Sequence, residues 1–225
     1  LLAGCGGAPW NDPYPASEGS ANILYTSFSE RPKHLDPVQS YSSNEITFTA
    51  QIYEPPLQYH YLKRPYTLIP LTAEAVPEPQ YFDAKGRRLP ASALQREIAH
   101  TVYEVRIKRG ILYQPHPAFA RGADGKPLYQ DLMREALSDK YKLSDFKETG
   151  TRELSARDFE YQIKRLAHPR LHSPILGLMN DYIAGLKEYA EALKSANEEL
   201  TARAGKNAWL DLSRYPLAGV EVMDD

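Results

Sequence analysis

The clearest alternation of hydrophobic and polar positions lies at residues 101–108. Three apolar residues alternate with three charged ones, in the order Tyr103, Glu104, Val105, Arg106, Ile107 and Lys108. Because successive side chains of a strand point to opposite faces, this pattern predicts a β-strand with one apolar and one charged face. Arg109 and Gly110 are expected to end it in a turn. A second β-prone stretch, residues 23–28, predicts another strand.

Apolar residues spaced by three and four positions predict the longest helix, which we expect to begin at Ser173 and Pro174. Serine is favoured as an N-cap and proline at the first helical position. The apolar stripe consists of Ile175, Met179, Tyr182, Ile183, Leu186, Tyr189 and Leu193. A stripe of this spacing occupies one face of a helix, so we expect it to pack in the core.

Two further helices are indicated by their end signals. Ser155 is followed three residues later by Asp158, which resembles a capping box and predicts a helix that Pro169 ends. Asn44 is expected to cap another helix, which Pro55 stops. A turn is predicted at residues 83–86, where the sequence reads Asp-Ala-Lys-Gly.

Glycine- and proline-rich stretches separate these elements. Residues 6–21 are rich in Gly, Pro and Ser and predict a flexible tether, with folded structure expected from Asn22 onward. Residues 113–152 surround one short helical pattern with several prolines and glycines. We therefore expect this segment to form a long excursion packed on the surface.

Composition narrows the function classes. Apolar residues make up 42% and charged residues 25% of the chain, as in ordinary globular proteins. Net charge is −2, Lys and Arg are scattered along the chain, and no basic stripe alternates with aromatics, so nucleic-acid binding is not expected. No apolar run has the length needed to span a bilayer. The 18 prolines and 16 tyrosines indicate ordered loops with aromatic surface, which suits a binding protein.

The single cysteine, Cys5, follows Leu1, Leu2, Ala3 and Gly4. An apolar stretch, two small residues and a cysteine are the pattern that is cleaved and lipidated in bacterial lipoproteins. The peptidase requires small side chains before the cut, and the thiol receives the lipid. Residues 1–5 are therefore interpreted as a signal-peptide remnant and lipobox, with lipidation at Cys5. The alternative is a buried or incidental cysteine.

Catalytic motifs are missing from the sequence. It contains no GxSxG, HExxH, P-loop or GxGxxG pattern. His168 and His172 are four residues apart, but Pro169 between them breaks the helix that would align them on a metal. An enzyme would have to use His116 or His168 with a carboxylate in a cleft, and no such cluster is indicated. We expect no enzyme activity, no metal and no cofactor.

Six segments, in order, resemble family 5 extracellular solute-binding proteins, the oligopeptide- and dipeptide-binding type. They are Leu35-Asp36-Pro37, then Gln51 to Leu57, Leu71 to Pro77, Tyr103 to Ile111, Leu154 to Phe159 with Lys164 to Pro169, and Leu217 to Val222. Each motif is short, and their order adds weight to the resemblance. The long segment at 113–152 departs from the family, whose members have a short loop there, and indicates a subgroup.

The resemblance implies an α/β fold that is periplasmic-binding-protein-like (class II, oligopeptide-binding type). Residues 22–50 would then start the first lobe, and residues 51–225 would form an auxiliary domain with 113–152 inserted. Family proteins continue into a second lobe, so we expect this chain to hold only the start of the first lobe and the auxiliary domain. By itself it would bind ligand poorly, because half of the cleft would be missing.

Ligand contacts also follow from the resemblance. Family members close two lobes by hinge motion around an extended peptide whose backbone bonds like an added strand. The counterparts of the contact residues are Tyr41, Ser42 and Ser43, after the Leu-Asp-Pro turn, and Ile175, after Ser-Pro. The alternatives are an ordinary loop leading to a helix cap for the first three and a core position for Ile175.

The implied function is the substrate-binding component of an ABC importer, which captures oligopeptides or related small solutes and delivers them to the permease. The alternative is a surface sensor or adhesin lipoprotein with the same fold. Expected partners are the solute, the permease in the inner membrane and, through Cys5, a membrane. The expected location is the periplasmic side or the cell surface, with the chain as a monomer.

Overall fold

The computed structural model describes residues 14, 17, 19–130 and 132–224. The chain forms two units, Leu1–Pro32 and Lys33–Asp225. In the first unit, residues 23–28 are extended but form no strand, and the Leu24 side chain is 91% exposed. The strand predicted there is wrong, since β-prone residues form a strand only where a second strand can accept their hydrogen bonds. Cys5 and most of the predicted tether lie outside the described residues.

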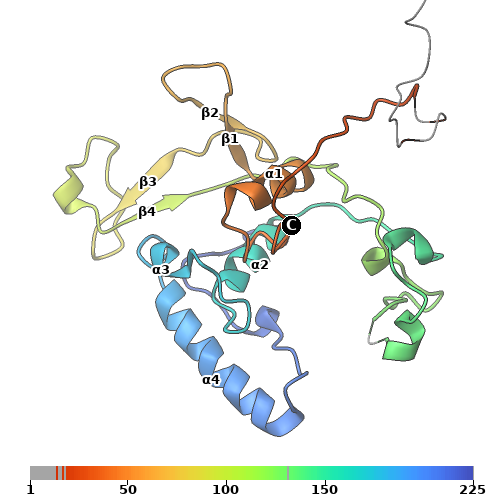
Figure 1. The fold of residues 1–225 in the computed structure, drawn as a ribbon. Coiled ribbons are helices and arrows are strands. Elements are labelled where there is room, and N and C mark those ends of the chain that lie inside the picture. Colours follow the sequence, from red (N-terminus) through yellow and green to blue (C-terminus); the bar gives the residue numbers. More distant parts are fainter. Residues whose placement is uncertain (1–13, 15–16, 18, 131, 225) are drawn as a thin grey trace, which may run out of the picture. The chain divides into compact units, whose positions relative to one another are not determined.

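The described residues of the second unit include four short strands, paired in two separate sheets (Figure 1). β1 (Leu57–Tyr59) pairs antiparallel with β2 (Leu68–Pro70), with Gln58 opposite Ile69. β3 (Pro79–Phe82) pairs antiparallel with β4 (His100–Tyr103), with Tyr81 opposite Thr101. The structure is therefore mixed α and β, with small antiparallel sheets.

Of the strand predicted at 101–108, only residues 101–103 lie in β4. β3 begins at Pro79 opposite Tyr103, and proline has no backbone NH to continue a ladder. Beyond that point the chain pairs elsewhere: Lys108 donates to Thr72 O at 2.8 Å, and Ala73 forms a single bridge with Ile107. Apolar and charged residues continue to alternate up to Lys108, but β3 has no residue that pairs with the chain beyond Tyr103.

Helix α1 (Ser43–Ile52) begins two residues earlier than predicted. Its N-cap is Ser42, and Asn44 lies inside the first turn, so the predicted Asn44 cap is wrong. Glu45, three residues after Ser42, completes a capping-box sequence and outcompetes the asparagine. The helix ends before Pro55 as expected. It includes residues 50 and 51, between which the boundary of the first lobe and the auxiliary domain was predicted.

Helix α2 (Ala156–Leu166) confirms the prediction from its capping box, with Ser155 as N-cap. The long predicted helix, in contrast, is divided into α3 (Leu176–Met179) and α4 (Leu186–Ala204). Gly185 separates them with φ of +75°, a left-handed conformation that favours glycine. Tyr182, predicted to be in the core, falls in the interruption and is 77% exposed.

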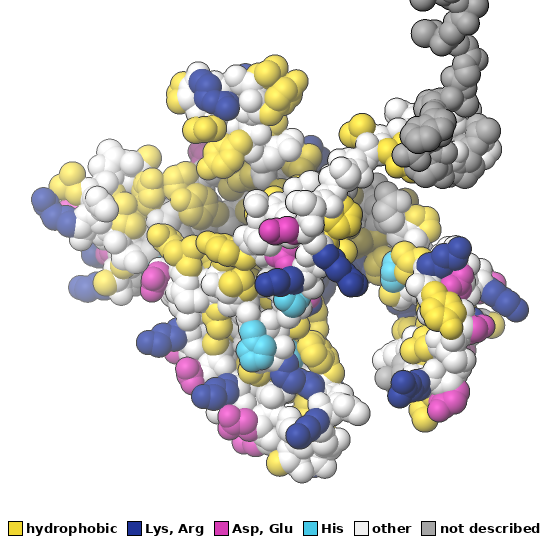
Figure 2. All heavy atoms as spheres, in the orientation of Figure 1, with side chains coloured by type: hydrophobic (Ala, Val, Ile, Leu, Met, Phe, Trp, Pro, Cys, Tyr) yellow, Lys and Arg dark blue, Asp and Glu magenta, His cyan; other side chains and the backbone are white. Residues whose placement is uncertain are grey.

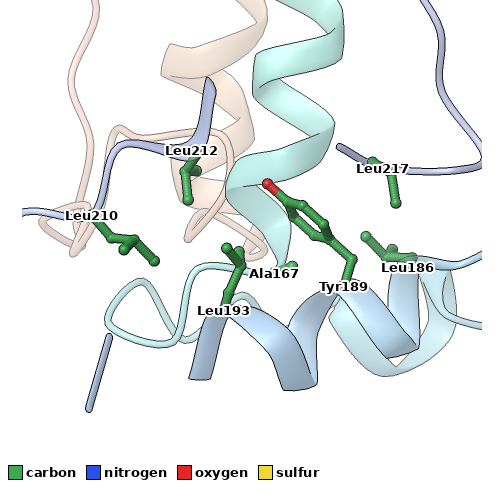
Figure 3. Packing of buried hydrophobic residues seen from close by; sticks show 7 residues of the cluster. All are labelled: Ala167, Leu186, Tyr189, Leu193, Leu210, Leu212 and Leu217. Atoms are coloured by element: carbon green, nitrogen blue, oxygen red, sulfur yellow. The ribbon is translucent and has the colours of Figure 1, made fainter. Parts of the chain in front are cut away.

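The main core joins α4 to α2 and the C-terminal segment (Figure 3). Leu186, Tyr189 and Leu193 of α4 point toward Ala167, at the end of α2. Three leucines from the segment after α4 complete the cluster, namely Leu210, Leu212 and Leu217. Seven buried side chains from three parts of the chain thus hold the helical region together.

The helical structure among the described residues of 113–152 consists of single turns: Pro117–Phe119, Arg134–Leu137 and Leu143–Asp145. Isolated bridges join Leu112 to Glu153 and His116 to Gly150, so the two ends of the segment lie side by side. Among its described residues, only Pro117 and Ala120 are buried.

Candidate functional site

The candidate site is built on the turn at Asp36, in the first motif of the resemblance. The Asp36 side chain accepts from Val38 N at 3.1 Å, and its carbonyl accepts from Gln39 N and Ser40 N. Its carboxylate also receives two hydrogen bonds from the Arg165 guanidinium of α2, at 3.0 and 2.5 Å. Both side chains are about one quarter exposed. A bidentate pair of this kind fixes orientation as well as distance.

Glu45 is the second organising residue. Its side chain is 4% exposed and accepts four backbone hydrogen bonds, from Lys33, His34, Tyr41 and Ser42, at 2.9 to 3.2 Å. The hydrogen bond from the Ser42 side chain, followed by that from Tyr41 N, lowers the pKa of Glu45 from 4.5 to about 2. The carboxylate therefore stays ionised at neutral pH and holds both ends of the loop before α1.

The predicted ligand contacts Tyr41, Ser42 and Ser43 lie on the loop that Glu45 holds. Tyr41 is 66% exposed, Ser42 is the N-cap of α1, and Ser43 is the first helical residue. Ile175 lies elsewhere, as the half-buried N-cap of α3. Among the described residues, no hydrogen bond, ion pair or ring contact joins Ile175 to the other three. Their role in ligand binding stays a prediction.

An open cavity of about 520 Å³ lies beside the same turn. It is lined by Pro37, Thr49, Ala50, Tyr53, Glu54, Pro55, Gln58 and Leu71. The walls therefore come from the Asp36 turn, the C-terminal end of α1 and the first hairpin. Glu54 is the only lining residue that carries a formal charge, so the cavity offers mostly apolar surface with few polar groups. None of Tyr41, Ser42, Ser43 and Ile175 lines it.

His168 occupies a structural position after α2. Its ring is 1% exposed and stacks on Trp209, with centroids 4.2 Å apart. Nδ1 accepts from Arg170 N at 3.2 Å. Burial, followed by the charges of Arg170 and Arg165, lowers the pKa of His168, so the ring is neutral at pH 7. This environment suits a packed ring that anchors the loop after α4.

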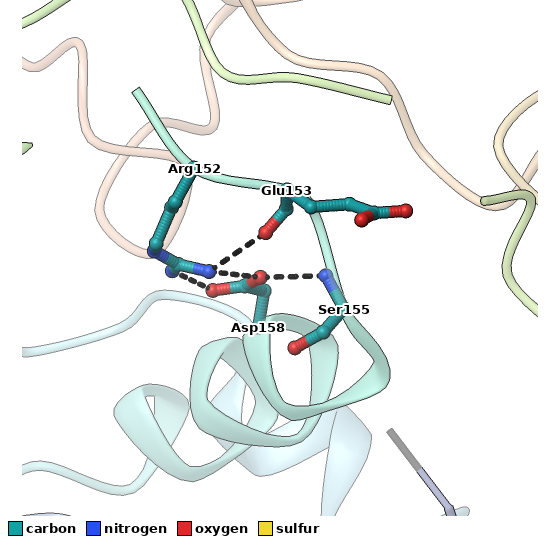
Figure 4. A network of polar contacts seen from close by, with 4 residues as sticks. All are labelled: Arg152, Glu153, Ser155 and Asp158. Carbon is teal, nitrogen blue, oxygen red and sulfur yellow. Dashed lines mark hydrogen bonds and ion pairs between the residues drawn. The ribbon is translucent and has the colours of Figure 1, made fainter. Parts of the chain in front are cut away.

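A second polar network lies where the 113–152 segment joins α2 (Figure 4). Arg152 forms a bidentate ion pair with Asp158 and also donates to the carbonyl of Glu153. Asp158 accepts from Ser155 N at 2.9 Å as well. Burial favours the neutral carboxylic acid, but Arg152 and the Ser155 NH outweigh it and lower the pKa of Asp158. The Arg152 guanidinium also lies 4.8 Å from the centre of the Tyr113 ring.

His116, the other histidine weighed for catalysis, is also structural. Its Nδ1 accepts from Ala118 N at 3.0 Å and caps the turn Pro117–Phe119. No three His, Cys, Asp or Glu side chains within the described part of the chain are grouped to hold a metal ion.

Sequence reasoning missed the roles of Glu45 and of the Asp36–Arg165 pair. The Ser-x-x-Glu spacing of Ser42 and Glu45 was the available signal, because this pattern marks a helix start. Nothing local identifies Arg165 as the partner of Asp36, since 129 residues separate them.

None of the helices that the structure describes is long and apolar enough to cross a membrane. No known family model, no curated protein and no solved structure matches this chain.

Proposed function

We propose that this chain belongs to a lipid-anchored solute-binding protein that captures peptides, or related small solutes, for an ABC importer. The fold would be the periplasmic-binding-protein-like α/β type. The protein would act outside the inner membrane and transfer its ligand to the permease. The proposal rests on the six ordered motif segments and on how two of them are connected in space.

The observation that carries the proposal is the Asp36–Arg165 pair. Asp36 belongs to the Leu-Asp-Pro motif, and Arg165 belongs to the Lys-Arg-Leu motif 129 residues later. A bidentate, partly buried pair requires both side chains at once. Two of the segments that carry the resemblance thus depend on each other, which supports a shared structural role for them.

The loop after Asp36 offers a rigid platform for a ligand. Glu45 holds the backbone NH groups of Tyr41 and Ser42, which leaves the Tyr41 ring exposed. An exposed tyrosine on a fixed backbone provides contact area at low entropic cost. In the proposed mechanism, this loop contacts an extended peptide, and water in roomy side-chain pockets keeps sequence selectivity loose.

Native mass spectrometry of the protein isolated from its own cells tests the proposal. We expect a ladder of bound peptide masses. A single non-peptide mass would keep solute capture and change the substrate class. A protein that stays empty against a peptide library would contradict solute capture and favour the sensor or adhesin role.

A matched pair of variants tests the loop itself. Tyr41→Ala is expected to lower affinity for the co-purified ligand about tenfold, as for a moderate hot-spot residue. Tyr141→Ala is the control, because Tyr141 is 89% exposed and lies in the 113–152 segment. Equal affinities of the two variants, measured by calorimetry, would remove Tyr41 from the binding site.

A further inference from the structure

The loop that connects β1 to β2 carries an unusual exposed surface. Tyr61 is 81%, Leu62 68% and Tyr66 71% exposed, and Tyr59 is 64% exposed at the end of β1. Tyr59 and Tyr66 meet edge to face with ring centroids 5.8 Å apart. Large apolar side chains concentrated on one exposed loop mark an interaction surface rather than scattered surface residues.

The same loop is purely cationic. Lys63 and Arg64 lie at its tip, and residues 55–73 contain no Asp or Glu. The Arg64 guanidinium lies 4.5 Å from the centre of the Tyr66 ring. Figure 2 shows this loop at the top of the view as yellow and dark blue surface, without magenta at its tip. Aromatic, aliphatic and cationic groups are therefore presented together.

Much of the loop backbone is already hydrogen-bonded within the loop. His60 Nδ1 accepts from Leu62 N and Lys63 N, at 3.2 and 3.3 Å. The carbonyls that accept bonds from within the loop are those of Tyr61, Lys63, Pro65 and Thr67. A backbone satisfied in this way loses less free energy when it leaves water for a less polar environment.

We propose that the 59–67 loop docks on the surface of an anionic lipid bilayer. Tyrosine rings are favoured at the level of the lipid headgroups, where one end of the ring is apolar and the other wet. Leu62 inserts at the tip, while Lys63 and Arg64 pair with negative headgroups. This inference concerns lipid contact only and does not depend on the proposed solute binding.

The charge distribution favours a membrane over the other occupants. A second copy of this chain carries 27 basic and 29 acidic residues, so its net charge of −2 offers little attraction to a cationic loop. A bilayer that contains phosphatidylglycerol instead presents uniform negative charge over an apolar interior, which matches both properties of the loop.

Vesicle flotation tests the docking, with the full chain carrying Cys5→Ser so that no acyl chain contributes. The probes are vesicles of phosphatidylcholine with 30% phosphatidylglycerol, and vesicles of phosphatidylcholine alone. We expect partitioning into the charged vesicles to be about twenty-five times stronger, since two cations contribute about fivefold each. Raising the salt concentration is expected to weaken it.

Two loop variants and two matched controls locate the contact. Tyr61→Ser with Leu62→Ser is expected to lower partitioning about tenfold or more, and Lys63→Gln about fivefold. The controls are Tyr141→Ser with Leu143→Ser, which also removes an exposed tyrosine and leucine, and Lys85→Gln, in the β3–β4 hairpin. Circular dichroism and urea midpoints confirm that all four variants fold.

Unbound wild-type protein, or loop variants that bind as well as their controls, would overturn the proposal. Sedimentation velocity without lipid supplies the remaining outcome. Self-association that the Tyr61 and Leu62 substitutions abolish would assign the loop to a second copy of the chain and would equally overturn the lipid assignment.

Discussion

The helical region at residues 156–217 and the segment at 113–152 are similar in their content of large apolar side chains but differ in what covers them. In the helical region, Leu186, Leu193 and Leu212 are fully buried. In the 113–152 segment, Met133, Tyr141 and Leu143 are 55% exposed or more. Apolar residues stabilise a fold only where a second element covers them, so we expect global stability to reside in the helical region.

The largest expected difference is between two leucines. Leu193→Ala removes a fully buried side chain and is expected to lower the free energy of unfolding by about 2–5 kcal/mol. Leu143→Ala removes an exposed side chain of the same kind and is expected to change it by no more than about 0.5 kcal/mol. Urea unfolding measures both, and comparable losses would show that the two regions share one core.

Two glycines allow the same test with matched substitutions, because each lies where an added Cβ would overlap a backbone carbonyl. The carbonyl is that of Ala184 for Gly219, beside the core, and that of Phe119 for Gly150, at the base of the 113–152 segment. Gly219→Ala is expected to lower the free energy of unfolding by about 1–3 kcal/mol. Gly150→Ala is expected to leave it nearly unchanged and to speed amide exchange within 113–152.

Gly177→Ala serves as the control for both variants, since a Cβ there meets no atom within 4 Å. Hydrogen exchange read by mass spectrometry separates local from global effects. A loss of global stability in Gly150→Ala equal to that in Gly219→Ala would contradict an independent 113–152 segment.

The smallest expected effect is a dependence on pH at the base of that segment. The pKa of Asp158 is lowered from 3.8 in the folded protein, so its pairing with Arg152 contributes stability above pH 3.8. That contribution is lost as pH falls below 3.8 and the carboxylate becomes protonated. In this pH range we expect the amides of 113–152 to lose the protection from exchange that they have relative to the Asp158→Asn variant. The amides of the helical region should remain protected.

The Asp158→Asn variant carries a neutral side chain at every pH. The ratio of the amide exchange rates of the wild-type protein and this variant removes the intrinsic effect of pH on exchange. A ratio that stays constant from pH 5 to below pH 3 would show that the Arg152–Asp158 pair does not hold the segment.

Part of the fold was predictable from residues close together in the chain. The start of α2 follows from Ser155 and Asp158, and its end from Pro169. The turn at 83–86 is confirmed by the hydrogen bond from Gly86 N to Asp83 O at 3.0 Å. Each of these features depends on groups within four residues of each other in the chain.

Predictions were wrong where a continuous hydrophobic pattern is interrupted because of contacts with residues distant in the sequence. The apolar stripe from Ile175 to Leu193 reads as one helix, but its second half packs on leucines that follow α4, with Gly185 interrupting it. The alternation at 101–108 is real, but only four residues from His100 onward find a partner strand. Periodicity predicts which face of a helix or strand is apolar, but it does not predict where the element that packs against this face ends.

The candidate site shows the same division. The local sequence is sufficient to specify the Asx-type turn at Asp36, the helix stop before Pro55 and the Ser42–Glu45 capping box, because these rest on short-range hydrogen bonds and on the fixed φ of proline. The contact of Arg165 with Asp36, and the hydrogen bonds that Lys33 N and His34 N donate to Glu45, form only when the chain folds. The residues in these contacts are 11 to 129 positions apart in the chain, and the free energy of the contacts is gained only after packing has brought the segments together.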